Sequence, residues 1–260
     1  MKWVVFSAVF KNYDKVFPAL HRMPGVDQVL FTDDPSLCVT GWKTVPVDVR
    51  DFPSGKAANV HYRALSHRYL SEYDVSLYID GNVRIIRQPL KLFAEFEASS
   101  ADIGIFPHTD RNTVSEELTT CADFGLADTN VMRAEYTAHA ADGFGDNVGL
   151  FDSSIIFKNH TSPRLNAAME HWDRSFQHYK TRDQLSLPYI IWKHGLIVHR
   201  LTGSSRQAND TFHFYPHIKG ADKIPLSVVI KARSRDRAVF RLFPLGFLIR
   251  CVRLVRKILR

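Results

Sequence analysis

The sequence has few cysteines and no long apolar segment. Its 260 residues include three cysteines that are far apart and have no CxxC spacing, so neither a disulfide framework nor a cysteine zinc site is indicated. We therefore expect a reducing compartment. No stretch reaches the roughly 20 apolar residues that span a bilayer, so we expect no membrane-spanning helix. Internal repeats and low-complexity linkers are also missing.

Excess charge of one sign is confined to the end of the chain. The formal net charge is +7, but residues 231–260 hold ten Lys or Arg and one acid, so residues 1–230 carry −2. A nearly neutral body is poor evidence for a nucleic-acid-binding fold, and we predict no nucleic-acid partner. The apolar run 3–10 stops without a small-residue cleavage site, so a first buried strand is a better interpretation than a signal peptide.

Apolar, β-branched runs alternate with segments of helical period. This pattern predicts one α/β domain over residues 1–230 with a mainly parallel sheet. A crossover helix is expected over residues 55–70, and the clearest helix begins at Ser162-Pro163, an N-cap followed by proline. The expected strands are 4–9, 28–32, 75–79, 103–106, 150–157 and 196–201.

The last 30 residues predict a separate region, an amphipathic basic helix. On a helical wheel the basic residues of 250–260 fall in one arc, and the apolar residues occupy the opposite arc. Such a helix binds anionic headgroups while its apolar face inserts, so we predict that residues 244–260 contact an anionic membrane surface. The alternative is a terminal helix that docks on the body and leaves its basic face in solvent. We expect a cytoplasmic protein, peripheral on the inner face of the cell membrane.

Asp80 and Asn82 follow an apolar strand and lie two residues apart around Gly81. Ligands of open α/β sheets bind outside the carboxyl ends of the strands, and a hard divalent cation on a diphosphate needs only one or two protein oxygens there. An Asp-Gly-Asn sequence is also ordinary β-turn composition. The spacing alone leaves both interpretations open.

Four ordered blocks extend this motif into a family resemblance. The blocks are FTDD at 31–34, EYDVSLYIDGN at 72–82, NVGLFDSSIIF at 147–157 and RDQLSLPY at 182–189. They resemble the glycosyltransferase-like domain shared by plant TOD1/MUCI70-type proteins and many bacterial proteins of surface-polysaccharide loci. The resemblance implies a single GT-A-like, Rossmann-like domain that moves a sugar from a nucleotide-diphosphate donor, expected to be UDP-linked, to a glycan or lipid-linked acceptor.

The resemblance also implies a metal site. Asp80 and Asn82 match the position of the DxD motif of such transferases, with Asn in place of the second acid, which removes one charge. His217 lies in a C-terminal stretch that resembles the one completing the metal and diphosphate site, so it is the third-ligand candidate, with Lys219 on a phosphate. An imidazole beside oxygen ligands favours Mn²⁺ over Mg²⁺. Alternatively, His213 and His217 form a surface pair.

Five further residues are candidates for binding the nucleotide sugar. Asp33 ends a strand, where it can accept a hydrogen bond from the base and ribose, and Tyr13 and Asp14 can line the same pocket. Lys56 and Arg63 are seven residues apart on the expected crossover helix, so both can reach a diphosphate. The alternatives are a turn, a loop and solvated helix charges, respectively.

Asp183 and Gln184 are the candidate catalytic residues. In the family that the sequence resembles, this pair faces the donor sugar and the reacting carbon, so Asp183 would position the sugar or stabilise an oxocarbenium-like transition state. A general-base role needs hydrogen-bond reach of the acceptor hydroxyl. Helix capping explains Asp183 without any catalysis.

His108, Asn147 and Asp152 are the candidates for contacts with the sugar or acceptor. His108 falls in the polar, poorly periodic segment 106–146, which we interpret as a lid over the donor that excludes water. Two other classes of function stay open. One is a non-catalytic, membrane-tethered protein that binds a nucleotide sugar or glycan, and the other is a membrane-surface or nucleic-acid-binding protein whose tail is the whole function.

Overall fold

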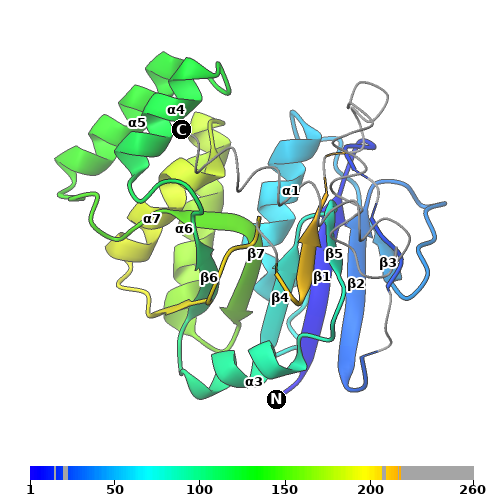
Figure 1. Ribbon diagram of the computed structural model, residues 1–260. Helices are drawn as coiled ribbons and strands as arrows, with labels where there is room; N and C mark the ends of the chain where they lie inside the picture. Colours follow the sequence, from blue (N-terminus) through cyan, green and yellow to red (C-terminus); the bar gives the residue numbers. More distant parts are fainter. Residues whose placement is uncertain (15, 20–22, 207–208, 216, 218–260) are drawn as a thin grey trace, which may run out of the picture.

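A computed structural model describes residues 1–14, 16–19, 23–206, 209–215 and 217. The chain folds around a seven-stranded sheet of order β3-β2-β1-β4-β7-β6-β8 (Figure 1). These strands are β1 (Trp3–Val9), β2 (Val26–Thr32), β3 (Lys43–Pro46), β4 (Val75–Ile79), β6 (Ile103–Pro107), β7 (Phe151–Asn159) and β8 (Val198–Arg200). A second sheet pairs β5 (Val83–Ile85) with β9 (Phe212–Phe214).

One strand of the large sheet runs against the others. The β1–β2, β1–β4, β2–β3 and β6–β8 pairs are parallel, whereas β7 is antiparallel to both of its neighbours, β4 and β6. The start of β7 therefore lies at the same edge of the sheet as the carboxyl ends of β1 and β4. The predicted α/β domain with a mainly parallel sheet is confirmed.

Helices cover the two faces of the sheet unequally. One face carries α1, which packs on β1 and α6, and α7, which packs on β7 and α6; α3 covers part of the other face (Figure 1). The helices are α1 (Gly55–Ala64), α2 (Ser66–Tyr69), α3 (Leu90–Ala98), α4 (Val114–Asp123), α5 (Thr129–Ala141), α6 (Pro163–Tyr179) and α7 (Asp183–Lys193).

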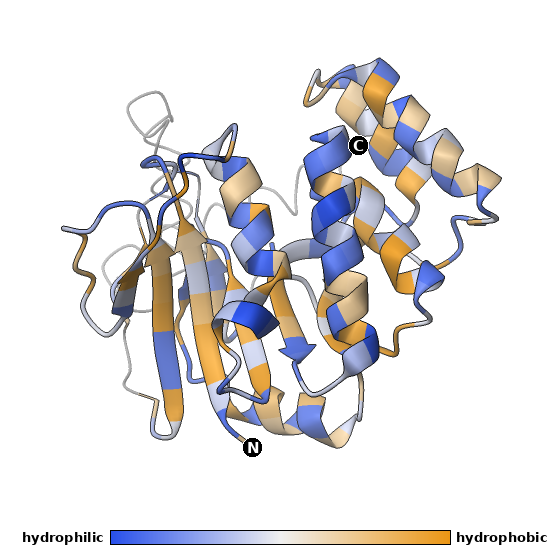
Figure 2. Cartoon of the chain, turned by 180° about the vertical axis from the view of Figure 1, so that it is seen from behind, coloured by the Kyte–Doolittle hydropathy of each residue, from blue (hydrophilic) through white to orange (hydrophobic). Residues whose placement is uncertain are grey.

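The hydrophobic core has one cluster on each face of the sheet. Phe6 on β1 points to the α1 and α6 side, where Trp172 is fully buried, and Val5 next to it points to the α3 side, where it joins Phe93 and Phe157. This alternation is why the central strands are apolar along nearly their whole length (Figure 2). The rigid sheet fixes the edge at which the polar side chains described below converge.

The starts of the helices follow the expected signals. Ser162 accepts a hydrogen bond from Leu165 N, and Pro163 is the first residue of α6, as predicted. The crossover helix predicted over 55–70 is instead interrupted at Leu65, whose backbone (φ −87°, ψ 25°) ends α1 before α2 begins. The segment 106–146 is also more regular than expected, because it holds α4, which starts with a capping box, and α5.

The helical tail predicted for residues 231–260, including the membrane-binding stretch 244–260, lies outside the described residues, as does the end of the predicted domain at residue 230. In the part of the chain that is described, no helix is both long enough and apolar enough to cross a bilayer.

Candidate active site

A cleft of about 380 Å³ opens at the carboxyl ends of β1 and β4. The starts of α1, α7 and β7 also reach this edge, so their first residues line the same cleft. Helix N-termini carry unpaired N–H groups and a partial positive charge, so this edge suits an anionic ligand. The sequence-predicted residues that the fold brings together here are Tyr13, Asp14, Lys56, Arg63, Asp80, Asp152, Asp183, Gln184 and His217.

Arg63 holds the centre of the cleft. Its Nη2 donates to Asp183 Oδ2 at 2.7 Å, its Nη1 donates to the carbonyl oxygen of Ser153 at 3.1 Å, and the same Nη1 lies 4.0 Å from Asp80 Oδ1. The guanidinium also lies over the rings of Tyr78 and Trp172, with its Cζ 5.4 and 5.1 Å from their centroids. Only 4% of Arg63 is exposed. It therefore orients two carboxylates and does not extend into the cleft as an open cation, which departs from its predicted contact with a diphosphate.

The two carboxylates beside Arg63 have opposite protonation tendencies. Desolvation raises the pKa of Asp80 to about 6, although Arg63 and a hydrogen bond from Tyr78 OH at 2.6 Å oppose this rise. Burial also acts to raise the pKa of Asp183, but Arg63, Lys56 and Arg182 overcome it and hold that pKa well below its usual range. Asp183 is thus a permanent anion, and Asp80 titrates nearer to neutrality.

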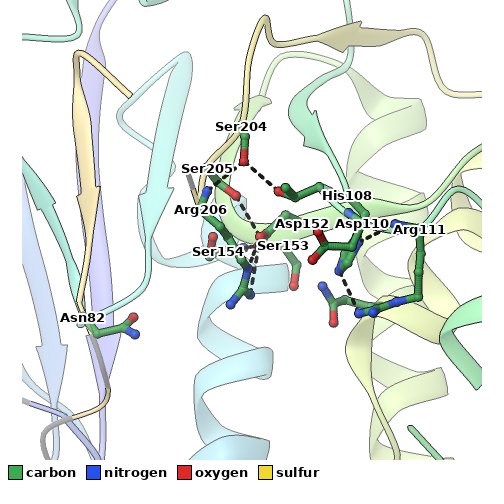
Figure 3. Close-up of polar contacts among 12 residues, drawn as sticks. Asn82, His108, Asp110, Arg111, Asp152, Ser153, Ser154, Ser204, Ser205 and Arg206 are labelled. Carbon is green, nitrogen blue, oxygen red and sulfur yellow. Dashed lines mark hydrogen bonds and ion pairs between the residues drawn. The ribbon is translucent and has the colours of Figure 1, made fainter. Parts of the chain in front are cut away.

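Asp152 anchors Arg206. The carboxylate is fully buried and accepts from Arg206 Nε at 2.5 Å and from Ser205 Oγ at 2.7 Å (Figure 3). The Arg206 guanidinium lies over the ring of Phe214, 4.5 Å from its centroid, and Arg206 lines the cleft. Asp152 was predicted to contact a sugar or acceptor, but its oxygens are directed at protein partners. The structure gives it the task of positioning Arg206.

Tyr13, Asp14 and His217 form one wall of the cleft. His217 Nδ1 lies 2.7 Å from Asp14 Oδ2, and this hydrogen bond raises the pKa of His217. The rings of Tyr13 and His217 meet edge to face with centroids 5.1 Å apart, and 47% of Tyr13 is exposed. An exposed aromatic ring beside a polar cleft can stack on a nucleobase or sugar.

A second wall, at the starts of α1 and α7, carries Lys56, Arg182 and Gln184. Lys56 Nζ donates to the carbonyl oxygen of Thr181 at 2.7 Å, and Arg182 Nη2 donates to Gln184 Oε1 at 3.0 Å. Gln184 is only 4% exposed, so its amide is fixed by packing. Both cations on this wall bond to neutral oxygens.

Four predicted residues that the structure describes do not line this cleft. Asn82 is fully buried in the turn before β5, its Nδ2 donates to the carbonyl oxygen of Tyr215 at 2.8 Å, and it lies apart from the Asp152–Arg206 pair (Figure 3). Asp33 instead accepts from the backbone N of Lys11 at 3.0 Å and faces a neighbouring groove.

His108 and Asn147 are the other two described exceptions. The His108 ring accepts from the backbone N–H groups that follow it and contacts Arg111, and Asn147 is exposed outside the cleft. Lys219 lies outside the described residues. The ring of His108 closes the turn after β6 and is not among the side chains that line the cleft.

The predicted metal ligands fit a divalent cation only in part. Asp80 presents a carboxylate that is 26% exposed, and the second ring nitrogen of His217 is not needed for the contact with Asp14. The Asn82 amide faces Tyr215 instead, and its Oδ1 has no hydrogen-bond partner among the described residues. Within those residues no group of three or more His, Cys, Asp or Glu could hold a metal. Asp80 and His217 can hold a cation if a bound diphosphate supplies further oxygens.

A comparison with protein families identifies the domain. The family described as "TOD1/MUCI70, glycosyltransferase-like domain" matches residues 25–202. The chain belongs to this family. The match spans Arg63, Asp80 and Asp183, whereas His217 and Arg206 lie beyond it. The central ion-pair cluster thus falls within the TOD1/MUCI70 domain, and part of the cleft wall comes from outside it.

Solved structures that resemble this TOD1/MUCI70 domain protein are glycosyltransferases by title. Mouse xyloside xylosyltransferase 1 is 13% identical with a TM-score of 0.44, over 77% of this chain and 85% of that chain. Core-mannan synthase A from Aspergillus fumigatus, in a Mn/GDP form, is 14% identical with a TM-score of 0.42, and the match covers 77% of this chain and 73% of that chain. WbbM, a bifunctional glycosyltransferase, is 12% identical with a TM-score of 0.47, and the match covers 76% of this chain and 38% of that chain. No curated protein matches the chain.

Two cleft residues were missed by the sequence reasoning, Arg182 and Arg206. Arg182 had a local signal, because it directly precedes the Asp183-Gln184 pair. Arg206 had none, since its partner Asp152 is 54 residues earlier in the chain. Arg206 was hidden because an ion pair between distant segments is set by the fold and leaves no spacing in the sequence.

Proposed function

We propose that this protein is a glycosyltransferase that moves a sugar from a nucleotide-diphosphate donor, UDP-linked, to a glycan or lipid-linked acceptor. The observation that carries the proposal is the cleft at the carboxyl edge of the sheet, where Arg63 holds Asp183 as an anion beside Asp80. Membership in a family described as glycosyltransferase-like supports the class of reaction.

Asp80 and His217 would hold a divalent cation, Mn²⁺ in preference to Mg²⁺ because one ligand is an imidazole. Such a cation supplies positive charge to the departing diphosphate, which is the main electrostatic demand of this reaction. Tyr13, on the same wall and exposed, would stack on the nucleobase. The donor would therefore lie with its nucleotide against this wall and its sugar toward α7.

Asp183 would act on the sugar as a fixed negative charge. Its low pKa makes it a weak base, because a carboxylate held by Arg63 gains little from taking a proton. A positioning or charge-stabilising role next to an oxocarbenium-like carbon uses the anion as it stands. Gln184, which is buried beside Asp183, would contact the same sugar.

We also propose that residues 244–260 attach the protein to an anionic membrane surface on the cytoplasmic side, where a lipid-linked acceptor would be presented. The support for this is the basic, amphipathic sequence of the segment.

The test is hydrolysis or transfer of nucleotide sugars by the full chain, with Mn²⁺, Mg²⁺ or EDTA. We expect turnover of a UDP-sugar that EDTA suppresses and that Asp80→Ala reduces by about 100-fold or more. Asp123→Ala, which removes an exposed carboxylate at the end of α4, is the matched control and should retain turnover. Undiminished turnover by Asp80→Ala would remove the metal-site proposal. Nucleotide-sugar binding without any turnover would favour the non-catalytic binding protein.

A further inference from the structure

The basic side chains that line the cleft are not equally neutralised. Arg63 contacts the carboxylate of Asp183 at 2.7 Å, and Arg206 contacts that of Asp152 at 2.5 Å. Each of these two guanidinium groups is therefore matched by a buried anion in direct contact. Removing either charge would leave an uncompensated carboxylate inside the protein.

Lys56 and Arg182 differ from this pattern. Lys56 Nζ bonds to a backbone carbonyl, and Arg182 Nη2 bonds to a side-chain amide. The carboxylate nearest to Arg182 is that of Glu117, 4.0 Å away, and Glu117 is already held by Arg111 Nε at 2.5 Å. In the described part of the chain, the Nε of Arg182 is buried and has no hydrogen-bond partner.

These two cations converge on the same place. Both line the cleft together with Asp183 and help to lower the pKa of that carboxyl through space, and among the described residues Arg63 is the cation that touches it. The wall formed by the starts of α1 and α7 therefore carries surplus positive charge. Asp80 lines the same cleft, and among the described residues its short side-chain contact is with an uncharged phenol, that of Tyr78.

We infer that Lys56 and Arg182 form an anion subsite, which binds an oxyanion group of the substrate directly. The inference rests on the proposed function for the identity of that substrate. The fixed fork of Arg182 suits two oxygens of one phosphate or carboxylate, and Lys56 adds a second point of charge. Arg63, which the sequence suggested for this task, instead keeps Asp183 in place.

Two sources supply such an oxyanion group. One is the diphosphate of the donor, and the other is the carboxylate of an acidic sugar on the donor. Three ligands separate the two sources. UDP and UDP-glucose carry the diphosphate but no carboxylate, whereas UDP-glucuronic acid carries both groups.

The experiment measures ligand affinity of the full chain by calorimetry in EDTA, so that no metal contributes. The ligands are uridine, UDP, UDP-glucose, UDP-glucuronic acid and inorganic pyrophosphate. The variants are Lys56→Met and Arg182→Gln, and the matched controls are Lys91→Met and Arg133→Gln, which alter exposed residues of α3 and α5. Thermal unfolding without ligand verifies that each variant is folded.

If the subsite binds the diphosphate, each variant should bind UDP and pyrophosphate about tenfold more weakly or worse, and its affinity for uridine should not change. A carboxylate subsite predicts that only the preference for UDP-glucuronic acid over UDP-glucose is lost. Unchanged affinity of both variants for all these anions would overturn the inference. If no uridine compound binds the unmodified protein, but pyrophosphate binds it and not the variants, the subsite stands and the proposed donor is wrong.

Discussion

Two buried polar regions lie at the two ends of the neighbouring strands β4 and β7. They differ in whether their basic groups are charged. At the cleft edge lies the cleft cluster, which consists of Arg63, Asp80, Ser153 and Asp183. At the other edge lies the interior network, which consists of Ser66, Ser76, Lys158 and His160. Both regions bury basic groups. These groups are ionised in the cleft cluster and neutral in the interior network.

The cleft cluster keeps its groups ionised. Burial acts to lower the pKa of Arg63, but the nearby Asp183 and Asp80 carboxylates raise it overall. Arg63 in turn keeps the pKa of Asp183 low. In the interior network, burial lowers the pKa of Lys158 well below its ordinary value and that of His160 to about 3. There the partners are carbonyl and hydroxyl oxygens: Lys158 donates to the carbonyls of Arg63 and Ala64, and His160 Nε2 lies 2.8 Å from Ser76 Oγ.

The difference shows that burial alone does not mark a functional group. A carboxylate in contact preserves a buried charge, whereas uncharged oxygens satisfy the same kind of group in its neutral form. Retained charge at the cleft edge is what an ionic substrate needs, and neutral groups at the other edge serve the fold. Three substitutions test this contrast.

The largest effect is expected from Arg63→Met. The change leaves the Asp183 carboxylate buried without its contact partner, so the free energy of unfolding should fall by about 3–5 kcal/mol. Urea unfolding followed by circular dichroism measures it. The double variant Arg63→Met/Asp183→Asn should recover part of the loss, because it removes the stranded charge. A double variant no more stable than the single one would mean that Asp183 is not ionised in the cleft cluster.

His160 should make the protein sensitive to acid. Its folded-state pKa of about 3 lies below the value of roughly 6.5 in an unfolded chain, so the unfolded state binds the proton first as the pH falls. Stability should thus drop by about 1.4 kcal/mol per pH unit below about pH 6.5 from this residue alone, or about 3 kcal/mol by pH 4.5. His160→Gln should reduce the slope of unfolding free energy against pH by that amount.

The control for this measurement is His178→Gln, which alters an exposed histidine near the end of α6. Its slope should match that of the unmodified protein. An unchanged slope in His160→Gln would show that His160 takes up a proton within the folded protein. The slope is the readout because the substitution also removes hydrogen bonds, which shifts stability at every pH.

The smallest effect at a single pH is expected from Lys158→Met. The side chain keeps its length and its contact with the Phe6 ring, but two carbonyls at the end of α1 lose a donor, at a cost of about 2 kcal/mol at neutral pH. Because the folded-state pKa is lowered, the unmodified protein should gain stability as the pH rises toward about 10, and the variant should not. Unfolding in urea at about pH 7 and 9.5 measures both. If the variant gained as much stability between these two pH values as the unmodified protein, Lys158 would be charged in the folded protein.

Much of the fold was predictable from local pattern. β4 matches its predicted bounds 75–79, and Ser162-Pro163 starts α6 as expected, because strand runs and capping residues are encoded in short windows of sequence. The reversed direction of β7 was not predicted, since an apolar run reads the same whichever way it runs in a sheet. That reversal is what brings Asp152 and Ser153, at the start of the strand, to the cleft.

The site was less predictable than the fold. Asp80 and Asp183 each follow or begin a regular element, so their place at the sheet edge could be inferred. Asn82 could not, because the direction of a side chain within a turn depends on what packs above it, here the carbonyl of Tyr215. The pairing of Arg206 with Asp152 likewise arises only once the loop after β8 has folded back over β7.

The helices α4 and α5 are inserted between β6 and β7, which are adjacent antiparallel strands that a two-residue turn could join. The order of the sheet therefore does not depend on this helical pair. The loop between the helices still brings Leu126 to the cleft, where it is 50% exposed. The helical pair is therefore a module whose length can change what enters the cleft without moving the strands and helices that carry Arg63, Asp80 and Asp183.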